Sequence, residues 1–204
     1  MNLKKLTPEL VAGITDAGLN LEPREIQEVS IPTIKSGANV IFVAPEGAGK
    51  STALVIAVIQ LLKKAVNDPP RALVLVETKE KAFDLEEQFK LIGKHTDLRI
   101  FTAFDQGDLL YQKDTIYAGT DVLIGTPRRM NELMQSAGFP FNQVKYFVVD
   151  DAEKFYYIQQ HHVIYRIAES IPKSQIVLFA NTWIDKFDLL SDRLMKNPQI
   201  IELE

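Results

Sequence analysis

Short apolar runs and longer amphipathic segments alternate along nearly the whole chain. Most of the apolar runs are continuous stretches of Val, Ile, Leu and Phe, which is typical of strands covered on both faces of a sheet. Strict alternation of such runs with helical segments predicts an α/β fold with a mostly parallel central sheet and helices on both faces. We expect strands at residues 40–43, 72–76, 98–102, 121–124, 146–149, 175–179 and 199–201, and helices between them at residues 50–66, 79–92, 109–117, 127–136, 152–170 and 184–194.

Two further helices are predicted before the first strand. Thr7, Pro8 and Glu9 supply an N-cap, a proline at the first helical position and an acidic residue at the positive end of the helix dipole. The second helix is expected at residues 23–34. Residues 67–70 read as a turn, and no repeat, low-complexity tract or interdomain linker interrupts the pattern. The sequence therefore predicts one domain that spans residues 1–204.

Composition narrows the classes of function. With 204 residues, 46% of them hydrophobic, the chain is long enough for the core of one α/β domain. The absence of cysteine excludes disulfides, thiolate metal sites and a thiol nucleophile. A net charge of −4 and a pI near 5.5 argue against bulk electrostatic capture of nucleic acid, so any such site must be a local basic patch. Without a signal-peptide core or a membrane-spanning run, we expect a cytoplasmic protein with no membrane partner.

The strongest chemical feature is at residues 40–52, where a β-rich run leads into a glycine-bearing loop and then an apolar helix. Gly47 and Gly49 allow the backbone to turn its N–H groups toward an anion, and the helix N-terminus adds a positive dipole. Lys50 can reach the outer phosphates of a nucleotide, and the Ser51 hydroxyl can ligate Mg²⁺. The motif's first glycine is replaced by alanine. The loop residues expected to bind nucleotide are Ala44, Gly47, Ala48, Gly49, Lys50, Ser51 and Thr52.

Two adjacent carboxylates follow another predicted strand, at Asp150 and Asp151. In a parallel sheet, ligands gather beyond the carboxyl ends of the strands, so Asp150 is expected to face the same crevice as Lys50 and Ser51. Asp150 would then hold Mg²⁺, and Asp151 would orient or deprotonate an attacking water. The alternative is that both residues only stabilise the N-terminus of the following helix, which for Asp151 stays equally open.

Four further segments occur in order around the loop. They are Pro23-Arg24-Glu25-Ile26-Gln27, Thr126-Pro127-Arg128-Arg129, Asp150-Asp151-Ala152-Glu153 and Ala180-Asn181-Thr182. With them, the chain resembles the first RecA-like domain of the DEAD-box RNA helicases over essentially its whole length. The resemblance implies a RecA-like P-loop NTPase fold, ATP and Mg²⁺ as cofactors, and single-stranded RNA as a weakly bound partner contacted through its backbone.

The resemblance also assigns roles to individual residues. Gln27 would read the adenine, Lys50 would bind the β- and γ-phosphates, and Ser51 and Asp150 would hold Mg²⁺. Asp151 would stand at the position that orients the water. The residues implied along an RNA track are Thr78, Lys79, Thr126, Arg128 and Arg129, and those implied in coupling the two sites are Glu153 and Thr182. For Thr126 and its proline a plain helix cap is a sufficient alternative, and for the arginines a solvated helix start is an equal one.

The departures from the family motifs fall mainly on catalytic positions. Asp151 replaces the glutamate of Asp-Glu-Ala-Asp and is shorter by one methylene, and Ala180 replaces the hydroxyl residue of Ser-Ala-Thr. In Pro-Thr-Arg-Glu-Leu-Ala, the proline is Glu77 and the arginine is Lys79, which loses a bidentate phosphate fork. Arg128 replaces the glycine of Thr-Pro-Gly-Arg. Binding chemistry is thus kept better than catalytic chemistry.

Two functions follow from this comparison. The first is the ATP- and RNA-binding first domain of a DEAD-box-type ATP-dependent RNA helicase, catalytically incomplete alone because a second RecA-like domain supplies arginines that this sequence lacks. The second is a stand-alone, non-catalytic interaction or regulatory module that responds to nucleotide. A weaker third hypothesis is a phosphotransferase or other loop-type NTPase whose other motif matches are accidental. Whether the chain hydrolyses ATP is left open by the sequence.

Overall fold

The predicted architecture is confirmed by the computed structural model, which describes residues 3–19, 23–66, 70–136, 141–171 and 173–204. Most of the turn predicted at residues 67–70 lies outside the described residues. Within the described part, the strands form one seven-stranded sheet in which every pairing is parallel. The strands are β1 (Val40–Val43), β2 (Ala72–Leu75), β3 (Ile100–Ala103), β4 (Val122–Gly125), β5 (Tyr146–Val149), β6 (Gln175–Ala180) and β7 (Gln199–Glu202).

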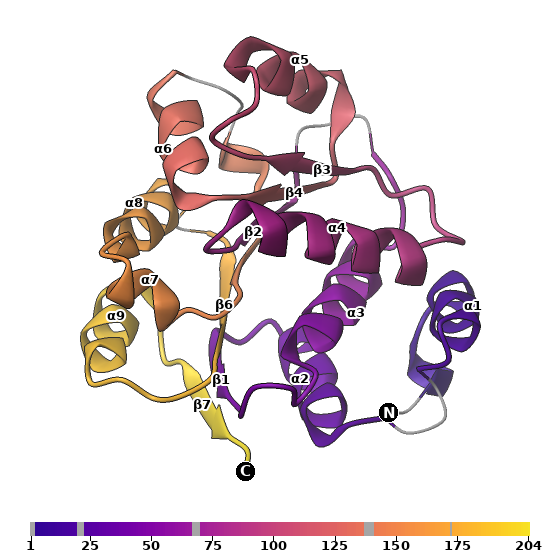
Figure 1. Cartoon of the computed structure of the whole chain (residues 1–204). Coiled ribbons are helices and arrows are strands. Elements are labelled where there is room, and N and C mark those ends of the chain that lie inside the picture. The colour runs from indigo at the N-terminus through magenta and orange to yellow at the C-terminus, as the bar shows by residue number, and fades with distance from the viewer. Residues whose placement is uncertain (1–2, 20–22, 67–69, 137–140, 172) are drawn as a thin grey trace.

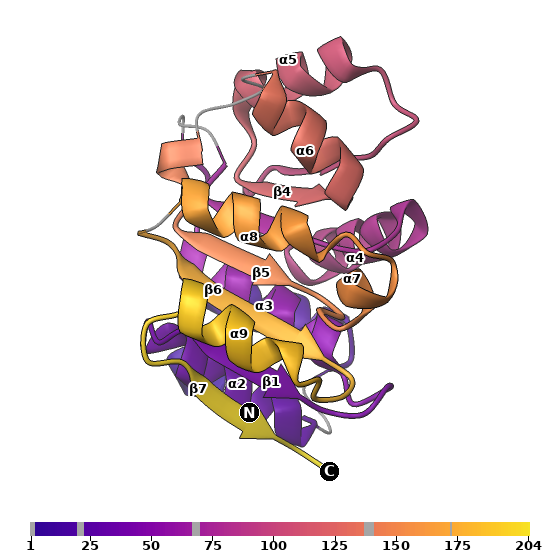
Figure 2. The ribbon, with the colours of Figure 1, turned by 90° about the vertical axis from the view of Figure 1, so that its left-hand side faces the viewer.

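Helices cover both faces of this sheet (Figures 1 and 2). One buried apolar cluster joins α1 to α4 to one face, and a second joins α5 to α9 to the other. None of the helices in the described part has the length and apolar character needed to cross a bilayer. The helices are α1 (Pro8–Asp16), α2 (Glu25–Lys35), α3 (Lys50–Leu62), α4 (Lys79–Ile92), α5 (Leu109–Gly119), α6 (Pro127–Gln135), α7 (Lys154–Tyr157), α8 (His161–Ser170) and α9 (Lys186–Leu194), with short 3-10 turns at Leu3–Lys5 and Phe141–Gln143.

The strand order is β3-β4-β2-β5-β6-β1-β7. The strands that lead into the candidate site, β2, β5, β6 and β1, are therefore consecutive in the sheet. Because all strands are parallel, their carboxyl ends lie at one edge, where the segments that follow them meet. The sheet order alone thus brings together residues that lie far apart in the sequence.

One predicted helix is divided in two and another ends earlier than the sequence pattern indicated. The helix expected at residues 152–170 is two helices, α7 and α8, separated at a residue with left-handed backbone, Gln159 with φ of 59°. The Gln160 N–H turns back to the carbonyl of Phe155 at 2.8 Å and closes the break. The helix expected at residues 50–66 ends at Leu62, because Lys63 has φ of 63°. Neither break contains the glycine or proline that marks a helix end in sequence.

Candidate functional site

The loop between β1 and α3 has the backbone that an anion cradle requires. Gly47 and Gly49 have φ of 81° and 93°, a left-handed conformation that glycine adopts without steric cost. Ala44 continues the pairing of β1, since its N–H donates to the carbonyl of Ala180 at 3.1 Å. Helix α3 begins at Lys50, directly after the second glycine. The loop therefore presents a helix N-terminus to the carboxyl edge of the sheet.

Lys50 is folded against its own loop. Its Nζ donates to the carbonyls of Ala44 at 2.7 Å and Pro45 at 2.9 Å and to Oδ1 of Asn181 at 2.8 Å. These contacts use every donor of an ammonium group. Burial lowers the pKa of Lys50, and the nearby charge of Asp151 opposes that shift. A bound phosphate would replace some of these acceptors with more negative ones.

Ser51 and Asp150 form the oxygen pair expected to hold Mg²⁺. The Ser51 hydroxyl donates to Oδ2 of Asp150 at 2.8 Å, and Asp150 is only 1% exposed. Its Oδ1 is buried without a hydrogen-bond partner among the described residues. Burial raises the pKa of Asp150, with a further contribution from the charge of Asp151.

This donor set fits a hard divalent cation that is also held by nucleotide phosphates and water. The described residues contain no cluster of three or more His, Cys, Asp or Glu that could hold a metal without them. When bound, Mg²⁺ would neutralise phosphate charge at Ser51 and Asp150.

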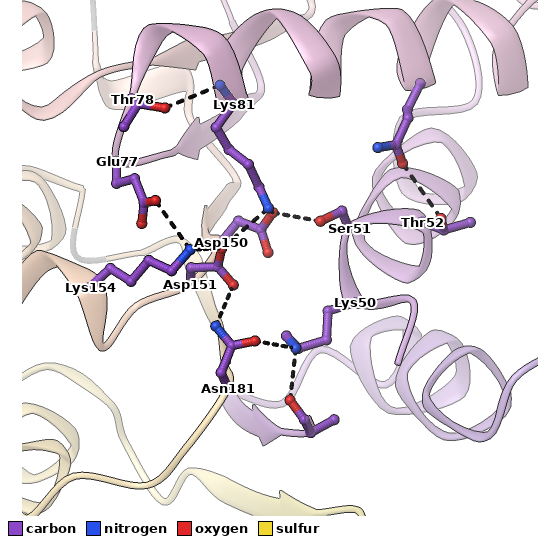
Figure 3. Close-up of polar contacts among 12 residues, drawn as sticks. Lys50, Ser51, Thr52, Glu77, Thr78, Lys81, Asp150, Asp151, Lys154 and Asn181 are labelled. Carbon is purple, nitrogen blue, oxygen red and sulfur yellow. Dashed lines mark hydrogen bonds and ion pairs between the residues drawn. The ribbon is translucent and has the colours of Figure 1, made fainter. Parts of the chain in front are cut away.

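Asp151 is held on both of its carboxylate oxygens. Oδ1 accepts from Nδ2 of Asn181 at 3.0 Å, while Oδ2 accepts from Lys154 at 3.0 Å and Lys81 at 3.2 Å (Figure 3). Its backbone is left-handed, with φ of 52°, which is uncommon for a residue other than glycine. Burial works to raise the pKa of Asp151, but the hydrogen bond from Lys154 and the charge of Lys81 outweigh it and lower the pKa. Asp151 is thus an ionised carboxylate with its partners in place.

Three of these partners were not predicted from the sequence. Lys81 stands at the leucine of Pro-Thr-Arg-Glu-Leu-Ala and Asn181 at the alanine of Ser-Ala-Thr, so the motif comparison marks both as departures but does not show that they contact Asp151. Lys154 also forms an ion pair with Glu77 at 3.2 Å. Glu77 stands at the proline of Pro-Thr-Arg-Glu-Leu-Ala. Burial favours the neutral form of Lys81, but attraction to Asp150 and Asp151 outweighs it and raises the pKa.

Several of these groups line one cavity of about 280 Å³. Four basic residues line it, Arg24, Lys50, Lys81 and Lys154. The surplus of cations over lining carboxylates favours a polyanionic ligand. The remaining lining residues are Glu46, Gly47, Gly49, Ser51, Thr52, Asp151 and Asn181.

Gln27 lies beside this loop, on α2. It is 4% exposed, and its Oε1 accepts from the backbone N–H of Arg24 at 3.2 Å, which caps the helix. A Cβ on Gly49 would stand 3.4 Å from Nε2 of Gln27, so the amide borders the phosphate loop. The Arg24 guanidinium donates to the carbonyl of Gly47 and ties α2 to the loop. Arg24 was not among the predicted site residues.

Four of the five residues predicted along an RNA track line a second cavity of about 320 Å³. Lys79 lies over the ring of Phe104, with Nζ 4.6 Å from its centroid, and Arg128 is 74% exposed at its side chain. Ile158 and Gln160, from the break between α7 and α8, also line this cavity. The four predicted residues are Thr78, Lys79, Thr126 and Arg128.

Arg129, the fifth, lies behind the wall of this second cavity. It is 3% exposed, and its Nη2 donates to the carbonyls of Asp105 at 2.6 Å and Gly107 at 2.7 Å. The Thr126 hydroxyl bonds the Asp105 carboxylate in the same loop. Arg129 therefore holds the loop that follows β3 and does not face the cavity.

The two residues expected to couple the sites differ in their surroundings. Glu153 is buried and accepts from the side chain of Asn181 at 2.6 Å and from its N–H at 3.2 Å. Thr182 is exposed, and its hydroxyl donates to the carbonyl of Trp183 at 3.4 Å. The link between the acidic segment and the 180–182 segment therefore passes through Asn181.

Comparison with solved structures identifies the fold. The chain is similar over 100% of its length to a DEAD box protein of the hyperthermophile Methanococcus jannaschii, with a TM-score of 0.91 and 20% identity, covering 55% of that chain. It is equally similar to the yeast DEAD-box splicing factor Prp28, with a TM-score of 0.90, 20% identity and 51% of that chain covered. The arrangement of sheet and helices is that of a RecA-like domain.

Sequence comparison adds relatives of greater length than this chain. The chain is 31% identical to the ATP-dependent rRNA helicase RRP3 of Scheffersomyces stipitis over 196 residues, which is 95% of this chain and 40% of that protein. It is 30% identical to the ATP-dependent RNA helicase DHH1 of Coccidioides immitis over 200 residues, 96% of this chain and 38% of that protein. The chain thus spans less than half the length of these relatives.

A family profile covers most of the chain. Residues 24–190, which contain both cavities and every strand except β7, match the DEAD/DEAH box helicase family. Together with the fold and the two relatives, this match shows that the chain belongs to the DEAD/DEAH box helicase family.

Proposed function

We propose that this chain is the nucleotide- and RNA-binding first RecA-like domain of a DEAD-box RNA helicase. The observation that carries the proposal is the cavity of about 280 Å³, where the phosphate loop, Lys50 and Ser51 meet the acidic segment after β5. Adenine nucleotide binds there with its phosphates on the loop and Lys50. Ser51 and Asp150 hold Mg²⁺, and Gln27 contacts the base.

Isothermal titration calorimetry with ATP, ADP and GTP tests the nucleotide site. Wild type is expected to bind ATP and ADP, and Lys50→Ala is expected to weaken ATP binding by about tenfold or more, because a charge-assisted contact to phosphate is lost. Lys64→Ala, at an exposed lysine after the same helix, is the matched control and should bind like wild type. Undetectable adenine nucleotide binding at millimolar ligand would contradict the proposal.

The setting of Asp151 supports a domain that is catalytically incomplete alone. A residue that orients an attacking water needs a carboxylate lone pair to accept from it, and here Lys81, Lys154 and Asn181 already compete for the two oxygens of Asp151. Asp151 is also one methylene shorter than glutamate, and a displacement of about 1 Å can cost on the order of a hundredfold in rate. The arginines of a second RecA-like domain complete the site in our proposal.

The same contacts favour a second candidate function. A stand-alone module that binds nucleotide without hydrolysing it, and changes its affinity for RNA or protein in response, needs the phosphate loop but no water-orienting carboxylate. The neutralisation of Asp151 by two lysines suits such a module. The two candidates differ in whether any complementing domain restores hydrolysis.

Single-stranded RNA occupies the second cavity in this proposal, with its backbone against Lys79, Arg128, Thr78 and Thr126. Arg129 acts indirectly, by holding the loop at residues 105–107. Since Lys79 and Arg128 are the cations that face the cavity, the salt dependence of binding should be shallow.

Fluorescence anisotropy with oligouridine and a mixed-sequence RNA over a salt series tests this part. Two phosphate contacts predict a slope of about −1.4 in log affinity against log salt, at roughly −0.7 for each contact. Arg128→Ala should flatten the slope by about 0.7, whereas Arg166→Ala, an exposed arginine on α8, should leave it unchanged. A slope near zero would point to a protein partner at this face instead.

A further inference from the structure

The ammonium group of Lys81 lies between the two carboxylates of the acidic segment. Its Nζ is 3.5 Å from Oδ2 of Asp150 and 3.2 Å from Oδ2 of Asp151. The backbone of Lys81 is fixed in the first turn of α4, where its N–H donates to the N-cap hydroxyl of Thr78 at 3.2 Å. The side chain is 30% exposed and lines the cavity.

The other two lysines of the site are committed to different partners. Lys50 is held by two loop carbonyls and Asn181, and Lys154 is paired with Glu77 and Asp151. Among the described residues, Lys81 is therefore the cation in contact with Asp150, the carboxylate expected to hold Mg²⁺. It supplies positive charge to the same oxygen, Oδ2, that receives the Ser51 hydroxyl bond.

A divalent cation at Asp150 would meet this ammonium as a like charge. Lys81 lies within a few ångströms of the carboxylate, and at such distances the repulsion between cations is strong unless water screens it. The motif that this segment resembles has leucine at this position, which brings no charge. Lys81 also lines the cavity with Arg24, Lys50 and Lys154, so an anionic ligand meets four protein cations without any metal.

We propose that Lys81 serves as a resident cation of the nucleotide site, which makes Mg²⁺ dispensable for the binding of adenine nucleotide by this chain. The inference rests on the proposed nucleotide site and deepens it. Lys81 neutralises Asp150 and Asp151 before ligand arrives and then faces the phosphate charge together with Lys50. The Lys81 side chain thereby neutralises phosphate charge that Mg²⁺ would otherwise neutralise.

Calorimetric titration of the full chain with ADP, once with excess Mg²⁺ and once with EDTA, tests the proposal. Wild type should give two dissociation constants that agree within about threefold, while Lys81→Met should bind at least about tenfold more weakly in EDTA than in Mg²⁺. Lys81→Arg keeps the charge and should behave like wild type. Lys90→Met, at a lysine on the same helix paired with Glu86, removes a charge outside the cavity and should also behave like wild type.

A second measurement needs no nucleotide. Binding of Mn²⁺, used as a paramagnetic substitute for Mg²⁺, is followed by electron paramagnetic resonance on wild type, Lys81→Met and Lys90→Met, each checked for its unfolding midpoint. Lys81→Met should bind Mn²⁺ about tenfold or more tightly than wild type, because the competing ammonium is gone.

The outcomes distinguish a failure of the role proposed for Lys81 from a failure of the proposed nucleotide site. Tenfold weaker ADP binding by wild type in EDTA, or equal Mn²⁺ binding by wild type and Lys81→Met, overturns the role of Lys81. Absence of ADP binding in every variant defeats the proposed nucleotide site, and the Mn²⁺ comparison then decides alone whether Lys81 competes with a metal.

Discussion

Asp151 illustrates how a conservative change at one position acquires its meaning from its neighbours. Shortening glutamate by a methylene removes reach, and the shorter side chain, on a left-handed backbone with φ of 52°, contacts Lys81, Lys154 and Asn181. Two of these partners also depart from the family motifs. The substitutions therefore form one set of contacts, in which the Asp151 carboxylate accepts hydrogen bonds from two lysine ammonium groups and the Asn181 amide.

Gln27 is a residue at which two roles can be separated by experiment. Its Oε1 caps α2 through the Arg24 N–H, and its amide borders Gly49. Gln27→Ala is expected to weaken ATP binding several-fold and leave GTP binding unchanged, since only adenine recognition is lost. It should also lower stability by about 1 kcal/mol through loss of the cap.

The measurement pairs calorimetry with both nucleotides and urea denaturation of the same samples. Thr33→Ala, a variant on the same helix at some distance from the loop, is the control for changes in α2 alone. Equal losses for ATP and GTP would show that Gln27 supports the loop without reading the base.

Among the elements, the amino ends of β2, β3 and β4 are joined by one carboxylate. Asp121, directly before β4, accepts from Arg71 at 2.8 Å and from Nε of Arg99 at 2.8 Å, and its Oδ1 also accepts from the N–H of Val66 at 3.1 Å. Asp121 is fully buried. This cluster fixes the end of the sheet opposite to the two cavities.

The Asp121 cluster should make folding sensitive to acid. Burial works to raise the pKa of Asp121, but the hydrogen bonds from Arg99 and Arg71 outweigh it, so the folded pKa is lower than the ordinary value of 3.8. A depressed folded pKa gives stability that is present above the unfolded pKa and is lost as pH falls through the folded one. Asp121→Asn should cost about 3 kcal/mol at neutral pH, since it leaves arginines without their counter-charge.

Urea denaturation of wild type and Asp121→Asn from neutral pH down to below pH 4 checks this expectation. The difference between the two proteins should be largest at neutral pH and shrink at the acidic end. Asp97→Asn, which removes a neighbouring carboxylate that accepts from the Ala65 N–H, is the control. A difference that stays constant with pH would contradict the assignment of Asp121 as a charged anchor.

The helices and strands predicted from the sequence agree with the structure better than the predicted contacts of single residues do. Strands such as β1 and β6 are runs of almost entirely apolar residues that are buried throughout, so the apolar pattern alone identifies them. The break between α7 and α8 was not predictable in this way, because Ile158, Gln159 and Gln160 all suit a helix and only tertiary packing sets the left-handed residue there. That break brings two side chains to the second cavity.

For the molecule as a whole, the acidic net charge of −4 conceals a local concentration of cations at the carboxyl edge of the sheet. The sequence predicted the loop, Ser51 and Asp150 because their chemistry is local and follows directly after strands. It did not predict Lys81 or Asn181 as partners of Asp151, because their proximity depends on the sheet order β2-β5-β6. Arg129 was predicted to face RNA but is buried, although its neighbour Arg128 is exposed, because tertiary contacts decide which of two adjacent arginines reaches solvent.

A complementing domain provides the test of catalytic competence. Single-turnover ATP hydrolysis is to be measured with saturating RNA for wild type and Asp151→Glu, each alone and fused after Leu203 to the second RecA-like domain of a DEAD-box relative. Alone, both should stay near background, because an arginine supplied by the second domain is typically worth about 10³–10⁵ in rate. In the fusion, Asp151→Glu should exceed wild type by about tenfold or more, since the longer side chain regains reach.

Robust hydrolysis by the lone wild-type chain would refute catalytic incompleteness. No gain in any combination would favour the non-catalytic module, with Lys81 and Asn181 as the groups that keep the carboxylate occupied. A fusion that binds RNA and ATP like its parent relative serves as the control for correct assembly.

The place of β1 in the sheet also has a consequence for biosynthesis. The strand that carries the phosphate loop is the first of the described strands to be made, yet its neighbours in the sheet are β6 and β7, the last two of these strands in sequence order. At about 5–20 residues per second, β1 waits many seconds without a pairing partner, an apolar segment open to chaperones. The nucleotide cradle is therefore completed only after β6 has been made, and a nascent chain stopped before residue 175 should hold β2 to β5 but no formed loop.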